Sequence, residues 1–154
     1  MEMPQPDARH QQLHRLAGTW QGVETMHPSP WDPGGSQADG RSVVKIALGG
    51  FYAIVDYTQS KDGHVVFEGH GVYSIDGGTG EVMLHWYDNI GQGVEEFRGA
   101  FAGDVLTLQS KNQVGFARLT YDYSQPGKLL SAMDMSPDGE NWNRLFDGVY
   151  ELRS

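Results

Sequence analysis

Residues 67–88 contain two runs in which apolar and polar side chains alternate, and the glycine-rich segment 77–80 separates them. Such alternation is typical of β-strands that bury one face. Asp76 and the glycines that follow it can adopt the backbone angles of a tight hairpin turn. The sequence therefore predicts a β-hairpin, and alternating runs with glycine turns recur along the later part of the chain.

The length of this turn decides which side chains share a face. A turn of two residues (77–78) or of four (77–80) produces the same two faces. We expect the more apolar face to point inward, and it carries Val65, Phe67, Gly69, Gly71, Tyr73, Ile75, Val82, Leu84 and Trp86. We expect the other face to point outward, and it carries Val66, Glu68, His70, Val72, Met83, His85 and Tyr87.

Similar runs elsewhere predict eight more strands. Their expected ranges are 18–24, 41–48, 51–59, 94–102, 105–110, 114–124, 128–136 and 142–153. Short turns between consecutive strands produce an antiparallel meander, and a sheet of this length removes its free edges most simply by closing on itself. The predicted fold is therefore all-β: a single antiparallel up-and-down β-barrel of about ten strands, with a short N-terminal helix.

The chain of 154 residues has the size of one domain. Residues 1–17 are predicted to form a tail and a short helix that caps the barrel, and residues 18–154 to form the barrel itself. The segment 26–39 contains three prolines, which remove strand hydrogen-bond donors, so we expect a long loop there. In that loop, Trp31 either lies with His27 over one barrel mouth or packs down to hold the loop.

The net charge of −9 is spread over the chain, and lysine and arginine form no stripe. Nucleic acid and anionic membrane surfaces are therefore not expected partners. No apolar segment reaches the length of a membrane span, and the first residues lack the pattern of a signal peptide, so we expect a cytoplasmic protein. The absence of cysteine excludes disulfides and thiolate metal sites.

A short helix followed by Gly18-Thr19-Trp20 resembles the start of the calycin superfamily, which includes the lipocalins. Further blocks in order are Trp-Asp-Pro-Gly-Gly, Gly-Phe-Tyr, Phe-Glu-Gly-His-Gly-Val-Tyr, His-Trp-Tyr-Asp, Gly-Asp-Val-Leu-Thr-Leu and Ser-Pro-Asp-Gly-Glu-Asn-Trp. Together they resemble an uncharacterised bacterial family with a calycin-like barrel, of the type called domain of unknown function 1579. The resemblance implies a lipocalin-like barrel, with Trp20 packed in its floor, and little chemistry.

Alternation around the barrel predicts an aromatic lumen with a few polar groups, a composition typical of small-molecule pockets. The expected inward side chains are Trp20, Glu24, Tyr57, Phe67, Tyr73, Trp86, Phe97, Phe101, Tyr121, Tyr123, Met133, Arg144, Phe146 and Tyr150. The predicted ligand-binding residues are Trp20, Glu24, Tyr57, Tyr73, Trp86, Tyr121 and Arg144. Arg144 would bind a ligand carboxylate, or else pair internally with Glu24 across the closing strands.

A second group is Glu68, His70 and His85, which lie close together across the hairpin in either allowed register. A carboxylate with two imidazoles could bind a metal or transfer protons, although their face is predicted to point outward. Nitrobindin-like barrels also begin with Gly-x-Trp and bind haem through a late histidine, but this chain has no histidine after His85. In that reading, His70 or His85 would have to substitute.

No nucleophile elbow, phosphate loop or zinc-protease motif is present, so no catalytic residue is assigned and the cofactor is unknown. The leading hypothesis is a barrel that binds a small, largely apolar ligand, which would carry a carboxylate if Arg144 faces the lumen. One alternative is a metal-dependent or acid–base enzyme that uses the histidine group. The other is a self-associating module with a filled barrel, in which the outer face with Val66 and Tyr87 forms a homodimer.

Overall fold

The computed structural model describes residues 2–30 and 32–153. Its helical elements are α1 (Ala8–Gln11) and the 3₁₀-helices η1 (Gln12–Leu16) and η2 (Leu48–Gly50). Its strands are β1 (Gly18–Met26), β2 (Ser36–Ala47), β3 (Tyr52–Lys61), β4 (His64–Ile75), β5 (Val82–Asp88), β6 (Glu95–Ala102), β7 (Val105–Asn112), β8 (Gly115–Asp122), β9 (Lys128–Ser136) and β10 (Asn143–Leu152).

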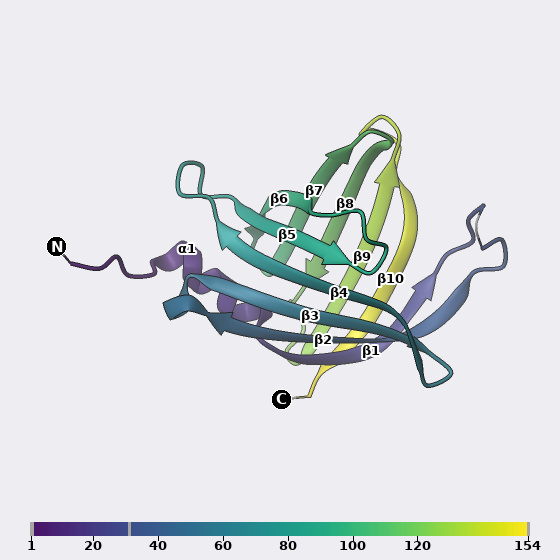
Figure 1. Cartoon of the computed structure of the whole chain (residues 1–154), viewed down its shortest axis with the longest axis horizontal. Coiled ribbons are helices and arrows are strands. Elements are labelled where there is room, and N and C mark those ends of the chain that lie inside the picture. The colour runs from purple at the N-terminus through teal and green to yellow at the C-terminus, as the bar shows by residue number, and fades with distance from the viewer. Residues whose placement is uncertain (1, 31, 154) are drawn as a thin grey trace.

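Each strand pairs antiparallel with the next in the chain, and β1 pairs with β10 to close the barrel (Figure 1). The closing ladder runs from Trp20 opposite Leu152 to Met26 opposite Phe146. The predicted single up-and-down barrel of ten antiparallel strands is therefore confirmed. Closure pairs the first strand with the last, which is the physical advantage that the meander pattern predicted.

The β4–β5 hairpin has the predicted register. Ile75 lies opposite Val82, and the connection contains the four-residue turn 77–80. The predicted inward side chains Tyr73, Val82 and Leu84 are each at most 5% exposed. The prediction that Val65 points inward is wrong, because this side chain is 56% exposed. It belongs to the first part of β4, which pairs with β3 only and lies beyond the start of the β4–β5 ladder.

The predicted long loop 26–39 is shorter in the structure, because β2 begins at Ser36 and pairs with the end of β1. The prolines all lie within 27–35, so residues from Ser36 onward are free to join the ladder. His27 is not among the residues that line the cavity, and its Nε2 is 2.8 Å from Asp147 Oδ2. The predicted role of Trp31 falls outside the described residues.

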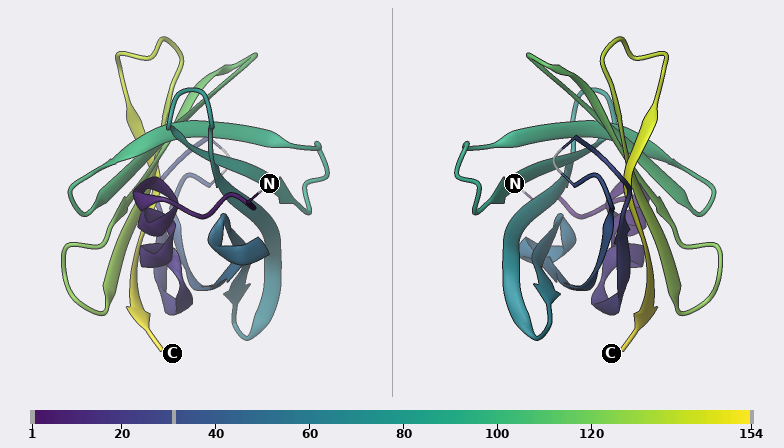
Figure 2. Two further views of the ribbon diagram at one scale, coloured as in Figure 1. Left: turned by 90° about the vertical axis from the view of Figure 1, so that its left-hand side faces the viewer. Right: turned by 90° about the vertical axis from the view of Figure 1, so that its right-hand side faces the viewer.

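The N-terminal helices close one end of the barrel, as Figure 2 shows in its left view. Leu13 and Leu16 are buried in the core, and the Trp20 indole nitrogen donates to the carbonyl of Leu16 at 3.0 Å. Arg15 reaches the β6–β7 turn, where it donates to the carbonyl of Gly103 at 2.6 Å. None of the helices in the described part of the chain has the length and apolar character to cross a membrane.

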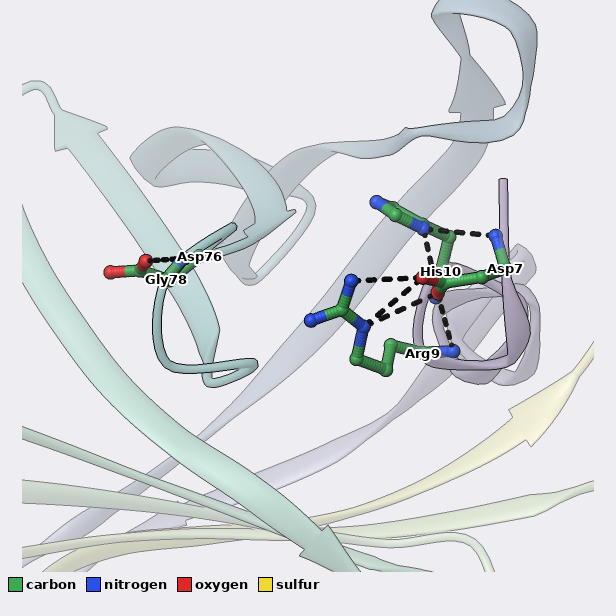
Figure 3. A network of polar contacts seen from close by, with 5 residues as sticks. All are labelled: Asp7, Arg9, His10, Asp76 and Gly78. Carbon is green, nitrogen blue, oxygen red and sulfur yellow. Dashed lines mark hydrogen bonds and ion pairs between the residues drawn. The ribbon is translucent and has the colours of Figure 1, made fainter. Parts of the chain in front are cut away.

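Asp7 caps α1 as predicted, through hydrogen bonds from the backbone nitrogens of Arg9 and His10 to its Oδ1 (Figure 3). The Arg9 guanidinium also donates to the Asp7 carboxylate at 2.9 Å, and this bond holds the pKa of Asp7 well below its usual range. The same Arg9 side chain lies near Gly80 of the β4–β5 turn. The capped helix therefore lies beside the β4–β5 turn at the closed end of the barrel.

Replacing Leu16 with alanine should lower the free energy of unfolding by about 2–5 kcal/mol, because the substitution opens a cavity under the plug. Leu16 is 1% exposed, and it also lines the inner end of the lumen. Urea denaturation followed by tryptophan fluorescence measures the change. Met3→Ala is the control, since Met3 is 78% exposed and its truncation should change stability by less than about 0.5 kcal/mol.

Candidate functional site

The barrel encloses a cavity of about 1310 Å³. Its inner end is formed by Leu16 and Trp20, beneath the N-terminal plug. Its outer end is lined by residues of the β5–β6 loop and the β7–β8 turn, which lie at the end of the barrel away from the plug. At this rim Ile90, Val94 and Val114 are between 54% and 77% exposed. The lumen therefore opens at the end opposite the helices.

Glu24 lines this lumen as a buried carboxylate, and it is 1% exposed. The hydroxyl of Tyr57 donates to its two carboxylate oxygens, which lie at 2.5 and 2.6 Å. The hydroxyl of Tyr150 donates to Oε2, and the side-chain amide of Gln59 donates to Oε1 at 3.0 Å. Three side chains from β3 and β10 thus satisfy the buried carboxylate, as burial of a charge requires.

Small residues on the neighbouring strands make room for the carboxylate. Glu24 lies between Ala38 of β2 and Gly148 of β10 in the two ladders. A Cβ atom at Gly40 would come within 2.6 Å of the Glu24 carboxyl carbon, and one at Gly148 would come within 2.7 Å of the Tyr150 ring. The sequence therefore sets two glycines where the polar cluster packs directly on the backbone.

Three aromatic rings lie together in the lumen, and one of them, Tyr57, also contacts Glu24. The ring centroids of Tyr57 and Phe67 are 6.0 Å apart at 63°, and those of Tyr57 and Trp86 are 6.1 Å apart at 52°. The Trp86 indole lies against Gly69, where any Cβ would come within 2.0 Å of the ring. Its Nε1 donates to Asp88 at 3.0 Å. We call Tyr57, Phe67 and Trp86 the aromatic wall.

Burial raises the pKa of every tyrosine hydroxyl in the lumen. The pKa of Tyr57 and of Tyr150 is well above the usual range, first because both are removed from water and second because the Glu24 charge is close. Burial also raises the pKa of Tyr73 and Tyr123 well above the usual range, and that of Tyr121 to about 12. The hydroxyls are therefore proton donors at neutral pH.

Nearly all side chains predicted to face inward line the cavity, including Trp20, Glu24, Tyr57, Tyr73, Trp86 and Tyr121. Phe101 instead packs against the core near the closed end, where the Arg15 guanidinium lies 5.6 Å from its ring centroid. The structure thus brings six of the seven predicted ligand-binding residues to one lumen. Their role in binding stays a prediction.

Arg144 is the exception, and it lies outside the lumen. The ladder between β9 and β10 shifts register between Arg144 and Phe146, and this β-bulge turns Arg144 to the outer face. There its guanidinium donates to Asp134 at 2.7 Å and to Asp147 at 3.4 Å. The two sequence hypotheses placed Arg144 in the lumen, either for a ligand carboxylate or for Glu24. Arg144 instead pairs with Asp134 and Asp147 outside the lumen.

Glu68, His70 and His85 face outward, as their strand positions predicted, and do not form one site. His70 Nδ1 is 2.7 Å from Asp56 on β3, whereas His85 Nε2 is 3.2 Å from Glu96 on β6. Within residues 2–30 and 32–153, no group of three potential metal-ligating side chains comes together. Neither histidine is among the residues that line the lumen, so neither is placed to hold haem there.

Sequence reasoning missed Gln59 and Asp88, which complete the polar contacts of Tyr57, Glu24 and Trp86. Gln59 follows Tyr57 by two positions on β3, so the alternation that placed Tyr57 inward also places Gln59 inward. The same spacing relates Asp88 to Trp86. Both residues could have been found by extending the inward face to the strand ends.

The fold has relatives among solved structures. Rv2717c from M. tuberculosis is similar with a TM-score of 0.71 and 16% sequence identity, over 96% of this chain and 99% of that one. The S-type phycobiliprotein lyase CPES from Guillardia theta is similar with a TM-score of 0.57 and 11% identity, over 97% and 98% of the two chains. At these identities the likeness concerns the fold alone.

No curated protein matches the sequence. The family described as protein of unknown function DUF1579 matches residues 5–151. This match covers nearly the whole chain and agrees with the resemblance that the glycine and tryptophan blocks indicated, as does the lipocalin-like barrel of the structural neighbours. The protein belongs to the DUF1579 family.

Proposed function

We propose that the protein binds a small, largely apolar molecule in the lumen of its barrel. The observation that carries the proposal is the cavity of about 1310 Å³, closed at one end by the N-terminal plug and lined mainly by apolar and aromatic side chains. Small-molecule sites combine such walls with a few polar groups that fix orientation. The cluster around Glu24 supplies those polar groups.

The filled-barrel alternative is disfavoured by the same cavity, because a structural module would pack its lumen with side chains. The enzyme alternative is disfavoured by the placement of Glu68, His70 and His85 on the outer face, where two of them pair with separate carboxylates. Association of two chains through that outer face does not depend on the lumen, and its test is the mass of the protein in solution.

Binding of the neutral fluorescent probe N-phenyl-naphthylamine tests the proposal. The wild-type protein should increase the fluorescence of the probe with saturable, one-to-one stoichiometry. Leu119→Trp should weaken binding by roughly fivefold or more, because the larger side chain projects into the space the probe would occupy. A wild-type protein that leaves the probe fluorescence unchanged would contradict the proposal.

Thr120→Trp is the matched control for this substitution. It adds the same side chain one position along β8, where the residue does not line the cavity. Binding by Thr120→Trp should equal that of the wild-type protein within about twofold. Equal losses in the two variants would mean that the probe binds outside the lumen.

A further inference from the structure

The buried carboxylate of Glu24 has the opposite sign of charge to the group that a carboxylate ligand needs. Glu24 is an acidic group buried beside the aromatic wall, and Arg144, the predicted cationic partner, lies on the outer face. Among the residues that the structure describes, no lysine, arginine or histidine forms an ion pair with Glu24. The tyrosine and glutamine donors satisfy its hydrogen bonds without neutralising its charge.

Most acceptor positions of the Glu24 carboxylate are already occupied by protein donors. A carboxylate offers about four lone-pair positions. Oε1 accepts from Gln59 and Oε2 accepts from Tyr150, and the two oxygens share the single hydroxyl proton of Tyr57. A ligand that needs to donate several hydrogen bonds would therefore have to displace protein donors. A cation without N–H groups would be attracted by the negative charge and would displace none of them.

The aromatic wall provides the surfaces that such a cation prefers. Tyr57 donates to Glu24 and contacts both Phe67 and Trp86, whose rings are inclined to it at 63° and 52°. Inclined aromatic faces next to a carboxylate attract alkylated ammonium groups through the ring quadrupoles. Further towards the mouth, the carboxyl groups of Asp88 and Glu95 also line the cavity.

We infer that the lumenal ligand carries a methylated ammonium group, which lies against Tyr57, Phe67 and Trp86 beside Glu24, and an apolar tail. This inference rests on the proposed function and names the chemical class of its ligand. The tail would extend along the apolar lining, which includes Leu84, Leu119 and Leu129. No covalent step is involved, and the selectivity arises from charge and ring contacts inside the cavity.

Four probes with the same ten-carbon tail separate the head-group chemistries: decyltrimethylammonium, decylammonium, decanol and decanoate. Isothermal titration calorimetry below their micelle concentrations gives each affinity. Decyltrimethylammonium should bind at least about tenfold more tightly than decanol, and decanoate should bind most weakly. Decanol or decanoate as the tightest ligand would overturn the inference and leave the proposed function intact. Tighter binding of decylammonium than of its trimethyl analogue would overturn the assignment of a methylated head group.

Two substitutions test the residues named. Glu24→Gln keeps the side-chain shape and should reduce the preference for decyltrimethylammonium over decanol to about twofold or less, while the affinity for decanol persists. Trp86→Leu removes one ring and should reduce the same preference by roughly threefold or more. Persistent decanol binding shows that each variant has kept its lumen, so loss of the preference is not a folding defect.

Asp56→Asn is the matched control for charge. Asp56 lies on the outer face of β3, beside His70, and its removal changes the net charge as much as Glu24→Gln does. This control should bind all four probes as the wild-type protein does. An equal loss of preference in Asp56→Asn and Glu24→Gln would overturn the inference in favour of a long-range charge effect. Failure of all four probes to bind the wild-type protein would instead contradict the proposed function.

Discussion

Raising the pH from about 10 to about 11 should unfold this barrel in one cooperative step, because burial raises the pKa of its five lumenal tyrosines. These residues are Tyr57, Tyr73, Tyr121, Tyr123 and Tyr150. An exposed tyrosine in the unfolded chain loses its proton near pH 10. The folded state retains these protons at that pH, so alkali favours the unfolded state.

The sign follows from the numbers of bound protons. Below about pH 10 both states hold the phenolic protons, and the tyrosines do not make stability depend on pH. Above it the unfolded chain releases them while the folded chain does not, so the free energy of unfolding falls as the pH rises. Each tyrosine contributes about 1.4 kcal/mol per pH unit until its folded pKa is reached. Five of them remove roughly 7 kcal/mol at pH 11, which is comparable with the whole stability of many domains.

Circular dichroism and the near-ultraviolet absorbance of tyrosinate, recorded on the same samples, check this prediction. The loss of β-structure and the main rise in tyrosinate absorbance should share one midpoint. Tyr123→Phe should move that midpoint to higher pH, because one raised pKa is removed. Tyr87→Phe, at an exposed position on the outer face of β5, should leave it in place. Complete tyrosinate formation before any loss of β-structure would contradict the assignment.

The alternation of the strands was enough to predict most of the barrel, because one buried face imposes a period of two on each strand. The β4–β5 hairpin shows this directly: the glycine turn fixed its register, and the register placed Tyr73 and Trp86 inside. The start of β2 at Ser36 was harder to predict from the sequence. The prolines mark where strand pairing is impossible but not where it begins again.

The sequence predicted the aromatic residues of the candidate site correctly, but it also placed the positive charge of Arg144 in the lumen, where the structure does not have it. Arg144 occupies a position that alternation assigns to the lumen, and the bulge before Phe146 reverses its direction. Bulges carry no reliable sequence signal, so this error could not be avoided from local pattern. Glu24 was placed correctly, but its partners come from β3 and β10, more than thirty residues away in sequence. Only the closed register shows that Glu24 is buried among neutral hydrogen-bond donors.

Burying the Glu24 cluster costs folding free energy that apolar side chains would not cost, and this difference bears on the function of the cluster. A buried charge and its hydrogen-bond partners are often no more stable than apolar side chains of similar volume. Gly40 and Gly148 are also required to accommodate the cluster, and glycine weakens a strand. A protein that needed only a stable barrel would gain nothing from this arrangement, so stability alone does not explain it.

The double substitution Tyr57→Phe with Tyr150→Phe should therefore lower the free energy of unfolding by about 3–6 kcal/mol, because it removes two hydroxyl donors from a buried charge. Adding Glu24→Met removes the charge itself and should restore stability to within about 1 kcal/mol of the wild-type protein. Urea denaturation measures both steps. Tyr123→Phe is the control, since it removes a lumenal hydroxyl that is not among those bonded to Glu24.

The expected pattern separates two explanations of the cluster. If the triple variant is as stable as the wild-type protein but has lost its preference for decyltrimethylammonium over decanol, the carboxylate serves ligand recognition at no benefit to the fold. If the triple variant is no more stable than the double variant, Glu24 contributes to the fold in a way that its hydroxyl partners do not explain. That result would contradict the view that the charge is kept for binding.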